Sequence, residues 1–298
     1  MSNKVTIEKI KVGDKSLKQN ELYGFFSIHP LPSQKELFEF YSQKYYEAKP
    51  NFLEKQRVDN KHRQSVFKTV LSTVEEHRGT NPGKILDIGC GVGFFLEFMK
   101  NQDWSATGIE LSKAASSTAL KNGLNVYSNE FDHKFIDEAG KFDLIYMNEV
   151  LEHVHNPETI IKTCFDALED NGLLYISVPN DFNPFQMILL EQKKYKPWWV
   201  SPPEHIHYFS FESLSNLLSF NKFKIVDLST SFPIDIFLLM GQNYVEDPIL
   251  GKKCHNLRTE FESTMIESGN NKLLKQIYNS FAKLHLGRHV KILAQKIN

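Results

Sequence analysis

Cysteine is scarce in this sequence, and the cysteines that are present lie far apart. The 298 residues contain three, Cys90, Cys164 and Cys254, with no Cys-x-x-Cys pair and no His/Cys group at zinc spacing. A chain of this length can bury enough apolar surface to fold without disulfide bonds or structural metal ions. We therefore exclude a disulfide-stapled or zinc-finger class and expect free thiols in a reducing, cytoplasmic compartment.

Long apolar runs and a surplus of basic charge are also missing. The best candidate for a membrane segment, residues 234–240, is short and contains Asp235, whereas a spanning helix needs about 20 apolar residues. The N-terminal stretch lacks the apolar centre of a signal peptide. Lys and Arg number 35 against 36 Asp and Glu, a net charge of -1, whereas dedicated nucleic-acid binders carry a basic excess or stripe. The composition predicts neither a membrane span nor a nucleic-acid partner.

From residue 84 onward the chain alternates short apolar strands with amphipathic helices. This alternation is typical of an α/β protein with a Rossmann-like, mostly parallel sheet covered by helices on both faces. The segment 179–203, rich in Pro, Phe, Trp and Lys, predicts neither helix nor strand. Seven strands are expected at residues 84–88, 106–110, 125–127, 142–147, 173–178, 223–228 and 289–294, and helices from 33 and at 63–77, 94–100, 112–122, 157–168 and 211–220.

This pattern divides the chain into three expected domains. Residues 1–60 form a lead of strands with a helical cap, 61–231 the Rossmann-like core, and 232–298 a mostly helical insertion followed by a final strand. An insertion of that size between two strands of one sheet is unusual. We therefore expect it to serve as a lid or a platform for the substrate.

The most informative stretch follows the first strand of the core. Asp87 stands near the strand end, and Gly89, Gly91 and Gly93 alternate with other residues before the next helix. Glycine permits positive φ and lets a ligand approach the backbone closely, and exposed amides at a helix start suit an anionic group. A tight strand-to-helix turn also needs glycine, so the loop alone has a purely structural alternative.

Two further features concern the ligand of this loop. Phe94 stands where the dinucleotide pattern GxGxxG places its third glycine, and Asp87 would repel a pyrophosphate, so we expect a ligand with a cationic end. The second strand ends at Glu110, where an acid in a Rossmann-like sheet accepts hydrogen bonds from ribose hydroxyls. Ser112 is expected to cap the following helix. An NAD-type oxidoreductase is therefore the less favoured alternative.

Four stretches, in order, resemble the class I S-adenosylmethionine-dependent methyltransferases, in particular the subgroup of ubiquinone-type and sugar methyltransferases. They are LDIGCGVGFF at 86–95, GIELS at 108–112, FDLIYMNEVLEHVHNPE at 142–158 and GLLYISVPN at 172–180. The resemblance covers about residues 60 to 230 and implies S-adenosylmethionine as the cofactor. The cofactor residues that it implies are Asp87, Gly89, Cys90, Gly91 and Gly93 at the methionine part, Glu110 at the ribose, Leu111 on the adenine, Glu130 or Phe131 at the adenine edge, and Met147 and Asn148 along the methyl-transfer face.

Methyl transfer to a hydroxyl requires a group that takes the acceptor's proton, and histidine suits that task at neutral pH. His205 and His207 follow the fifth strand, in a region that closes over the substrate in the resembled group, so either is a candidate base or substrate-positioning residue. Each imidazole is about as well explained by a hydrogen bond to backbone. The tail, residues 232–244, 251–258 and 286–290, resembles methyltransferases of bacterial surface-polysaccharide clusters, which implies a small acceptor such as a sugar or nucleotide sugar.

Glu149, Glu152 and His153 form an E-x-x-E-H pattern that is implicated in metal binding in ubiquinone-type O-methyltransferases. The same pattern occurs in relatives without metal dependence, and we predict no metal. A ubiquinone-type O-methyltransferase with a divalent metal stays open as an alternative, as does a non-catalytic binding subunit with this fold. Nucleic-acid methylation is less favoured, because no Asn-Pro-Pro-Tyr or Asp-Pro-Pro-Tyr motif follows the fourth strand.

Two further groups of residues can be explained either by a function or by a purely structural role. In many relatives an N-terminal helix supplies an aromatic residue or an arginine to the cofactor, whereas core tyrosines and solvated charges explain the same residues here. The aromatic and lysine residues around 193–209 suit a sugar-like or phosphorylated acceptor, or else a packed core with a solvated face. The N-terminal candidates are Tyr45, Tyr46, Arg57 and Arg63, and the later ones are Lys193, Lys194, Tyr195, Lys196, Trp198, Trp199, Tyr208 and Phe209.

Overall fold

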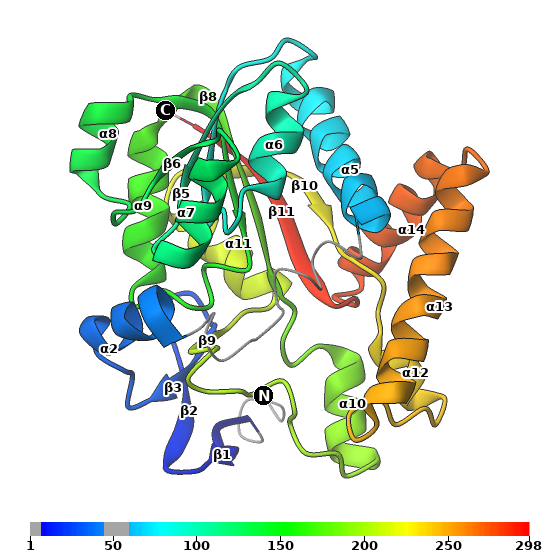
Figure 1. The fold of residues 1–298 in the computed structure, drawn as a ribbon. Coiled ribbons are helices and arrows are strands. Elements are labelled where there is room, and N and C mark those ends of the chain that lie inside the picture. Colours follow the sequence, from blue (N-terminus) through cyan, green and yellow to red (C-terminus); the bar gives the residue numbers. More distant parts are fainter. Residues whose placement is uncertain (1–6, 45–59, 298) are drawn as a thin grey trace. The chain divides into compact units, whose positions relative to one another are not determined.

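The computed structural model describes residues 7–44 and 60–297, so the candidates Tyr45, Tyr46 and Arg57 lie outside the described residues. The chain forms two compact units, each built from separate stretches of sequence (Figure 1). Unit 1 comprises Met1–Leu31, Ser177–Leu217 and Leu228–Lys291, and unit 2 comprises Pro32–Ile176, Leu218–Asp227 and Ile292–Asn298. The three-part division expected from the sequence stays a prediction.

Unit 2 is organised around the seven-stranded sheet, whose strand order is β10-β11-β8-β7-β4-β5-β6. β4 pairs in parallel with β5 and with β7, and β5 pairs in parallel with β6. This confirms the predicted α/β fold with a mostly parallel sheet. The strands are β4 (Lys84–Ile88), β5 (Ser105–Ile109), β6 (Asn125–Tyr127), β7 (Phe142–Asn148), β8 (Leu168–Pro179), β10 (Phe223–Ser229) and β11 (His289–Lys296).

The helices of the core begin at residues that stabilise helix N-termini. Ser112, Asp132 and Asn156 each accept a hydrogen bond from the backbone N–H three residues on, as N-cap residues do. Pro157 occupies the first turn after Asn156, where a missing N–H costs nothing. The helices are α5 (Asn60–Arg78), α6 (Phe94–Lys100), α7 (Lys113–Lys121), α8 (His133–Ala139), α9 (Pro157–Ala167) and α11 (Phe211–Phe220).

These helices cover the sheet and close its core. Figure 1 shows α5 and α6 on one face of the sheet and α9 on the other. Ile85 and Leu144, on neighbouring strands, are fully buried, as expected for a parallel sheet covered on both sides. The core under α5 and α6 consists of Phe67, Val70, Leu71, Val74, Ile85, Phe95, Phe98, Met99, Trp104, Leu144, Tyr146, Leu173, Tyr175 and Leu293.

Unit 1 contains a second, four-stranded sheet in the order β1-β2-β3-β9. Its pairs are antiparallel, and β3 pairs with β9 through Phe26↔Tyr208 and Ser27↔His207. The predicted strand-rich lead is confirmed, whereas β9 was not predicted. The strands are β1 (Lys11–Val12), β2 (Lys15–Gln19), β3 (Phe26–His29) and β9 (His207–Tyr208).

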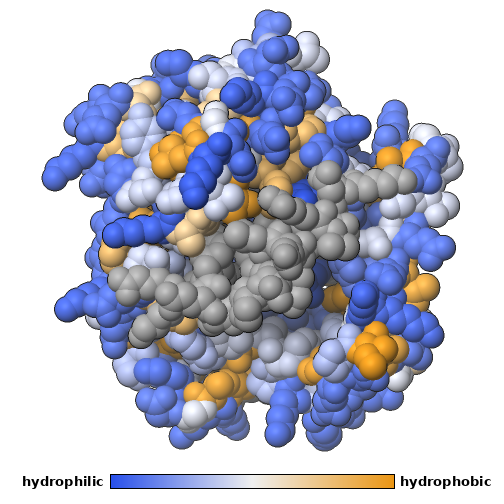
Figure 2. Space-filling view, viewed as in Figure 1, coloured by the Kyte–Doolittle hydropathy of each residue, from blue (hydrophilic) through white to orange (hydrophobic). Residues whose placement is uncertain are grey.

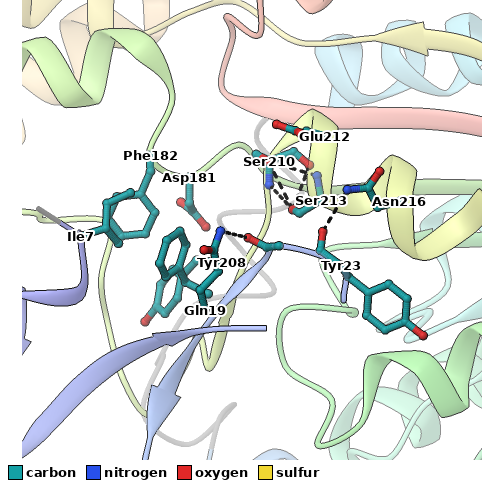
Figure 3. A pocket seen from close by; sticks show the side chains of 12 residues that line it. Ile7, Gln19, Tyr23, Asp181, Phe182, Tyr208, Ser210, Glu212, Ser213 and Asn216 are labelled. Atoms are coloured by element: carbon teal, nitrogen blue, oxygen red, sulfur yellow. Dashed lines mark hydrogen bonds between the residues drawn. The ribbon is translucent and has the colours of Figure 1, made fainter. Parts of the chain in front are cut away.

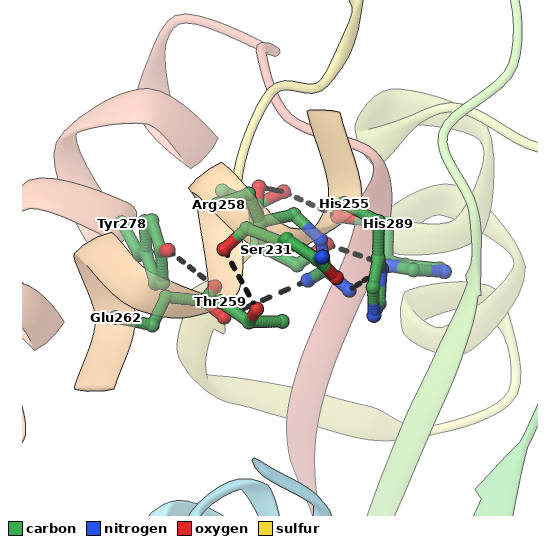
Figure 4. Close-up of polar contacts among 9 residues, drawn as sticks. Ser231, His255, Arg258, Thr259, Glu262, Tyr278 and His289 are labelled. Atoms are coloured by element: carbon green, nitrogen blue, oxygen red, sulfur yellow. Dashed lines mark hydrogen bonds and ion pairs between the residues drawn. The ribbon is translucent and has the colours of Figure 1, made fainter. Parts of the chain in front are cut away.

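The expected helical insertion between β10 and β11 is also confirmed. It contains α12 (Asp235–Leu239), α13 (Pro248–Glu267) and α14 (Asn271–Lys283). A polar cluster joins α13 to α14: the Tyr278 hydroxyl donates to Glu262 at 2.5 Å, and Arg258 lies 3.6 Å from the same carboxylate (Figure 4). A buried carboxylate is tolerated only with such partners, so this cluster fixes the pairing of the two helices.

One expectation about secondary structure is wrong. Residues 179–203 contain a helix, α10 (Pro184–Gln192). Asn183 accepts hydrogen bonds from the N–H groups of Phe185 and Gln186, and Pro184 stands in the first turn. These are two standard start signals of a helix. The prolines and tryptophans around this stretch led us to predict neither helix nor strand in spite of these start signals.

The surface is largely polar, as expected from a sequence without long apolar runs. Figure 2 shows a face on which hydrophilic side chains predominate. Among the described residues, no helix is both long and apolar enough to cross a membrane.

Candidate functional site

The carboxyl ends of β4, β5 and β7 meet at one edge of the sheet in unit 2. Ile88 is in register with Ile109 on one neighbour and with Met147 on the other. Ligands of open α/β sheets bind at this edge. The segments that leave it are the glycine loop after β4, Glu110 and Leu111 after β5, and the loop from Asn148 after β7.

The backbone of the glycine loop has the geometry that only glycine adopts without strain. The φ angles are 72° at Gly89, 56° at Gly91 and 87° at Gly93. A Cβ on Gly89 would lie 2.5 Å from Val150 Cγ2, and one on Gly93 would press against Leu124 Cδ1. The glycines thus serve the packing of the loop and also leave its outer surface without side chains.

Four N–H groups of this loop are paired within the protein, and the expectation that the amides at the start of the next helix suit an anionic group stays a prediction. The N–H groups of Gly89 and Cys90 donate to Ile109 O at 2.8 and 3.0 Å. The N–H of Gly91 donates to Glu110 Oε2 at 2.9 Å, and that of Gly93 to Cys90 O at 3.0 Å. These four N–H groups are therefore already satisfied within the protein. The Cys90 thiol is buried, which raises its pKa and keeps it neutral.

Two acids stand beside the loop. The side chain of Asp87 is buried with 3% exposure; burial raises its pKa well above the usual range, and the charge of Glu110 raises it further. Burial also raises the pKa of Glu110, and hydrogen bonds from the N–H groups of Ser112 and Gly91 partly offset this. Neighbouring buried carboxylates are costly when both are ionised, so the pair favours a ligand with positive charge.

The other predicted cofactor residues differ in how much surface they expose. Leu111 is half-buried directly after Glu110, and Glu130 and Asn148 are exposed. Phe131 is buried, with its ring centroid 6.0 Å from that of Phe135. Met147 is fully buried in β7. The roles predicted for these side chains stay predictions. Of Met147 and Asn148 at the end of β7, Asn148 is the residue whose exposed side chain a ligand could contact.

The loop after β7 holds the E-x-x-E-H residues and contacts the N-terminal segment of unit 2. That segment has α2 (Gln34–Glu39) followed by a π-helix, η1 (Phe40–Lys44). His153 Nδ1 lies 2.8 Å from the Tyr41 hydroxyl, and His153 Nε2 lies 3.6 Å from Glu152 Oε1. Both nitrogens of this imidazole thus face protein groups. The Tyr41 contact was not predicted, since nothing in the sequence pairs residues so far apart.

The two candidate bases belong to unit 1 and have different surroundings. His207, in β9, is 2% exposed; its Nδ1 lies 2.8 Å from the Ser27 hydroxyl and its ring meets the edge of Phe25. His205 is half-buried, and its carbonyl accepts a hydrogen bond from Tyr208 at 2.8 Å. The burial of His207 suits a structural role, and His205 is the better candidate of the two.

Unit 1 also contains a pocket of about 220 Å³ beside its four-stranded sheet (Figure 3). Asp181 and Gln19 lie among its polar side chains, and Phe182 among its apolar ones. Ligand pockets for drug-sized molecules measure roughly 300–1,000 Å³, so this space suits at most a small group. The full lining is Ile7, Gln19, Tyr23, Gly24, Phe26, Asp181, Phe182, Tyr208, Ser210, Glu212, Ser213 and Asn216.

Comparison with known proteins agrees with the fold. Residues 59–228 match a protein family described as "Methyltransferase domain". The chain belongs to this family of methyltransferase domains.

Curated relatives are similar to this chain over part of its length. A ubiquinone biosynthesis O-methyltransferase of Glaesserella parasuis is 35% identical over 122 residues, which are 38% of this chain and 52% of that protein. One of Pseudomonas aeruginosa is 31% identical over 116 residues, 37% of this chain and 50% of that protein. The chain therefore spans about half the length of the curated relatives that it matches.

Two solved structures share the fold. A plantazolicin methyltransferase in complex with S-adenosylhomocysteine has a TM-score of 0.55 at 17% identity, over 88% of this chain and 94% of that one. The 1,6-didemethyltoxoflavin-N1-methyltransferase of Burkholderia thailandensis has a TM-score of 0.52 at 14% identity, over 97% of this chain and 98% of that one. At such identity the likeness concerns the fold alone.

Proposed function

We propose that this chain transfers the methyl group of S-adenosylmethionine to a hydroxyl of a small acceptor, a sugar or a nucleotide-linked sugar. The observation that carries the transfer itself is the pair of acids, buried Asp87 and half-buried Glu110, beside a glycine loop at the carboxyl edge of the sheet. The sugar acceptor is supported by the aromatic and lysine side chains of unit 1, and by the resemblance of the tail to methyltransferases of bacterial surface-polysaccharide clusters.

The residues at the sheet edge fit the cofactor. When bound, S-adenosylmethionine supplies a methyl group already activated by a sulfonium. The Asp87–Glu110 pair would hold the cationic part, since a positive charge offsets the repulsion of two neighbouring carboxylates. Glu110, already fixed by the N–H groups of Gly91 and Ser112, would accept from the ribose hydroxyls. The protein's main contribution is alignment and exclusion of water.

The acceptor would bind to unit 1, with the insertion 232–298 contributing to its site. Tyr195, Trp198 and Trp199 form a chain of edge-to-face contacts, with centroids 5.8 and 4.8 Å apart. Exposed lysines stand beside them at 193, 194 and 196. Aromatic rings pack on sugar faces, and lysines attract phosphate. A sugar carrying a phosphate, as in a nucleotide sugar, combines both requirements.

A second candidate acceptor is a phenolic hydroxyl. It is favoured by the relatives, which are named ubiquinone biosynthesis O-methyltransferases. Their identity covers 38% of this chain and 52% of the Glaesserella parasuis protein, so it does not single out a particular acceptor. A divalent metal at Glu149, Glu152 and His153 would accompany this alternative.

We also propose that His205 acts as a base or as a substrate-positioning residue. His207 is the weaker candidate, because its Nδ1 lies 2.8 Å from Ser27 in a buried strand pair. His205→Ala would slow turnover and leave the affinity for S-adenosylmethionine unchanged. Unchanged turnover in both His205→Ala and His207→Ala would remove these residues from the mechanism.

The experiment that tests the function has two stages. Isothermal titration with S-adenosylmethionine and S-adenosylhomocysteine should give binding that Asp87→Ala and Glu110→Ala weaken; no heat with either ligand would refute the cofactor site. Labelled S-adenosylmethionine is then incubated with UDP-glucose, UDP-galactose, GDP-mannose, the free sugars and a catechol, with and without EDTA. Methylated sugar supports the first candidate, and EDTA-sensitive methylation of the catechol alone supports the second.

A further inference from the structure

The pocket beside the four-stranded sheet of unit 1 contains a buried carboxylate (Figure 3). Asp181, which follows β8, is 4% exposed, and its backbone N–H donates to Phe209 O at 2.9 Å. Burial raises the pKa of Tyr208, another residue of the lining, and the charge of Asp181 raises it further, so the carboxylate lies close to that phenol. A carboxylate at this depth is costly unless positive charge or hydrogen bonds balance it.

Aromatic rings form the wall next to this carboxylate. The centroid of the Phe182 ring lies 5.6 Å from that of Phe26, with 59° between the planes, and 6.0 Å from that of Tyr208, with 70°. Phe182 has a φ of 56° although its side chain is bulky, a conformation that persists where the surrounding structure holds it. Rings that are inclined to one another in this way can offer their faces to an ammonium group.

The side-chain donors of the pocket are directed to other groups of unit 1. The hydroxyls of Ser210 and Ser213 donate within the turn that joins these two residues. Three more side chains donate to backbone carbonyls: the Tyr208 hydroxyl to His205 O at 2.8 Å, Gln19 Nε2 to Gly24 O at 2.9 Å, and Asn216 Nδ2 to Tyr23 O at 3.3 Å. These donors therefore stabilise the walls of the pocket.

Acceptors and negative charge remain for a ligand. The amide oxygens of Gln19 and Asn216 can only accept hydrogen bonds, as can an ionised carboxylate. Glu212, which is exposed, adds a second carboxylate to that of Asp181. Among the described residues that line the pocket, none carries a positive charge. The ligand that complements this lining has N–H or C–H groups to offer and a positive charge.

The size of the pocket restricts the ligand to a head group. Its volume is about 220 Å³, whereas pockets for drug-sized molecules measure roughly 300–1,000 Å³. This volume is too small for a whole nucleotide sugar and large enough for an ammonium group with its carbon substituents. A hard metal ion is a poorer match, because it requires several oxygen ligands and the side chains of Ile7, Phe26 and Phe182 supply none.

We propose that this pocket binds a small organic ammonium group, either primary or methylated. The carboxylate of Asp181 balances the charge of the ligand, and the rings of Phe26 and Phe182 pack against its nitrogen and the adjoining carbons. Two sources share this chemistry, namely the amino group of an acceptor such as an amino sugar, and a separate small amine. The inference goes beyond the proposed function and does not depend on it, because it concerns binding within unit 1.

The first test uses pairs of probes that differ in charge and share their shape. Choline is compared with 3,3-dimethylbutan-1-ol, and ethylammonium with ethanol, at constant ionic strength on the full-length wild-type protein. Titrations followed by ligand-observed NMR should show at least one cation with a Kd about tenfold or more below that of its neutral counterpart. Equal affinities within both pairs, or no binding of either cation, would overturn the proposal.

Matched variants assign the binding to this pocket. Asp181→Asn keeps the shape of the side chain and removes its charge, so it should raise the Kd of the cation about 10–100-fold. Phe182→Leu removes a ring and should raise it about 2–30-fold. Glu191→Gln neutralises an exposed acid of α10 that lies outside the lining and should keep the wild-type Kd. Wild-type affinity in a folded Asp181→Asn variant would overturn the proposal, and if that variant does not fold, the probe pairs on the wild-type protein decide it.

A last set of measurements distinguishes the two sources of the ammonium group. Glucosamine and UDP-glucosamine are added to the acceptor panel beside glucose and UDP-glucose. A lower KM for the amino sugar, together with competitive inhibition by the bound cation, assigns the group to the acceptor, whereas binding of the cation without competition assigns it to a separate amine. Saturation with S-adenosylhomocysteine should leave the Kd of the cation unchanged, and displacement would overturn the proposal by assigning the pocket to the cofactor. If the proposed function fails, no member of the panel is methylated, and the binding measurements still decide the inference.

Discussion

Gly93→Ala is the substitution whose cost the structure defines most closely. Gly93 has a φ of 87°, and a Cβ there would press on Leu124 Cδ1 at a separation that real Cβ atoms do not show. Leu124 is itself buried, packed with Leu96, Ala119 and other residues of one cluster. Neither the backbone nor the neighbour can therefore yield without loss.

Two costs add at this position. A non-glycine residue in the left-handed region costs about 1–2 kcal/mol, and overpacking a buried site costs about 1–3 kcal/mol. We expect Gly93→Ala to lower the free energy of unfolding by about 2–5 kcal/mol. Gly79 has the same φ of 87° but nothing within 4 Å of the added Cβ, so Gly79→Ala should lose only about 1–2 kcal/mol.

The assay is urea unfolding followed by circular dichroism, on the wild-type protein and both variants. A third variant, Leu124→Ala, should lose about 2–5 kcal/mol alone. Combined with Gly93→Ala it should lose about 1–3 kcal/mol less than the sum, because the clashing methyl is gone. Equal losses in Gly93→Ala and Gly79→Ala, or strict additivity with Leu124→Ala, would refute the packing argument.

Three further predictions concern the site and its supports. Because burial raises the pKa of Glu110, its carboxylate takes up a proton at a higher pH than an exposed glutamate does. The affinity for S-adenosylmethionine, measured by titration calorimetry, should therefore fall as the pH drops through that range. Glu110→Gln should bind S-adenosylmethionine weakly at neutral pH, and its affinity should depend less on pH. Asn156→Ala removes the 3.1 Å cap on the Thr159 N–H and should cost about 0.5–2 kcal/mol of unfolding free energy, while Asn156→Ser should restore most of it. His207→Ala should cost about 1–3 kcal/mol in the same assay, since it leaves the Ser27 hydroxyl without its partner; a stable His207→Ala variant with slowed turnover would instead favour a direct role in the reaction.

Elements with local signals could be predicted from the sequence almost to the residue. The expected strands 84–88 and 125–127 and helices 94–100 and 211–220 coincide with β4, β6, α6 and α11. The expected cap of Ser112 is present, with its hydroxyl accepting from Ala115 N. Strand periodicity, glycine breaks and cap residues all act over a few positions, so a single sequence contains them.

What could not be predicted depends on pairing between distant residues. β9 is a two-residue strand that exists because β3 offers it a partner, and the environment of His207 follows from that pairing. The partners of the glycine-loop amides were not predicted, because they depend on the register of β4 on β5, which brings Ile109 O and the Glu110 carboxylate to them. The Tyr41–His153 contact joins residues 112 positions apart, and no spacing rule reaches that far.

The pairing of β3 with β9 has a consequence for how the chain is made. Ser27 and His207 are 180 positions apart, and a ribosome that adds 5–20 residues per second needs roughly 10–40 s to cover that distance. During this interval the nascent chain has an open strand edge at Phe26–His29, which other growing chains could pair with. Slow translation or crowded polysomes should therefore lower the yield of active protein more than thermal stability would suggest.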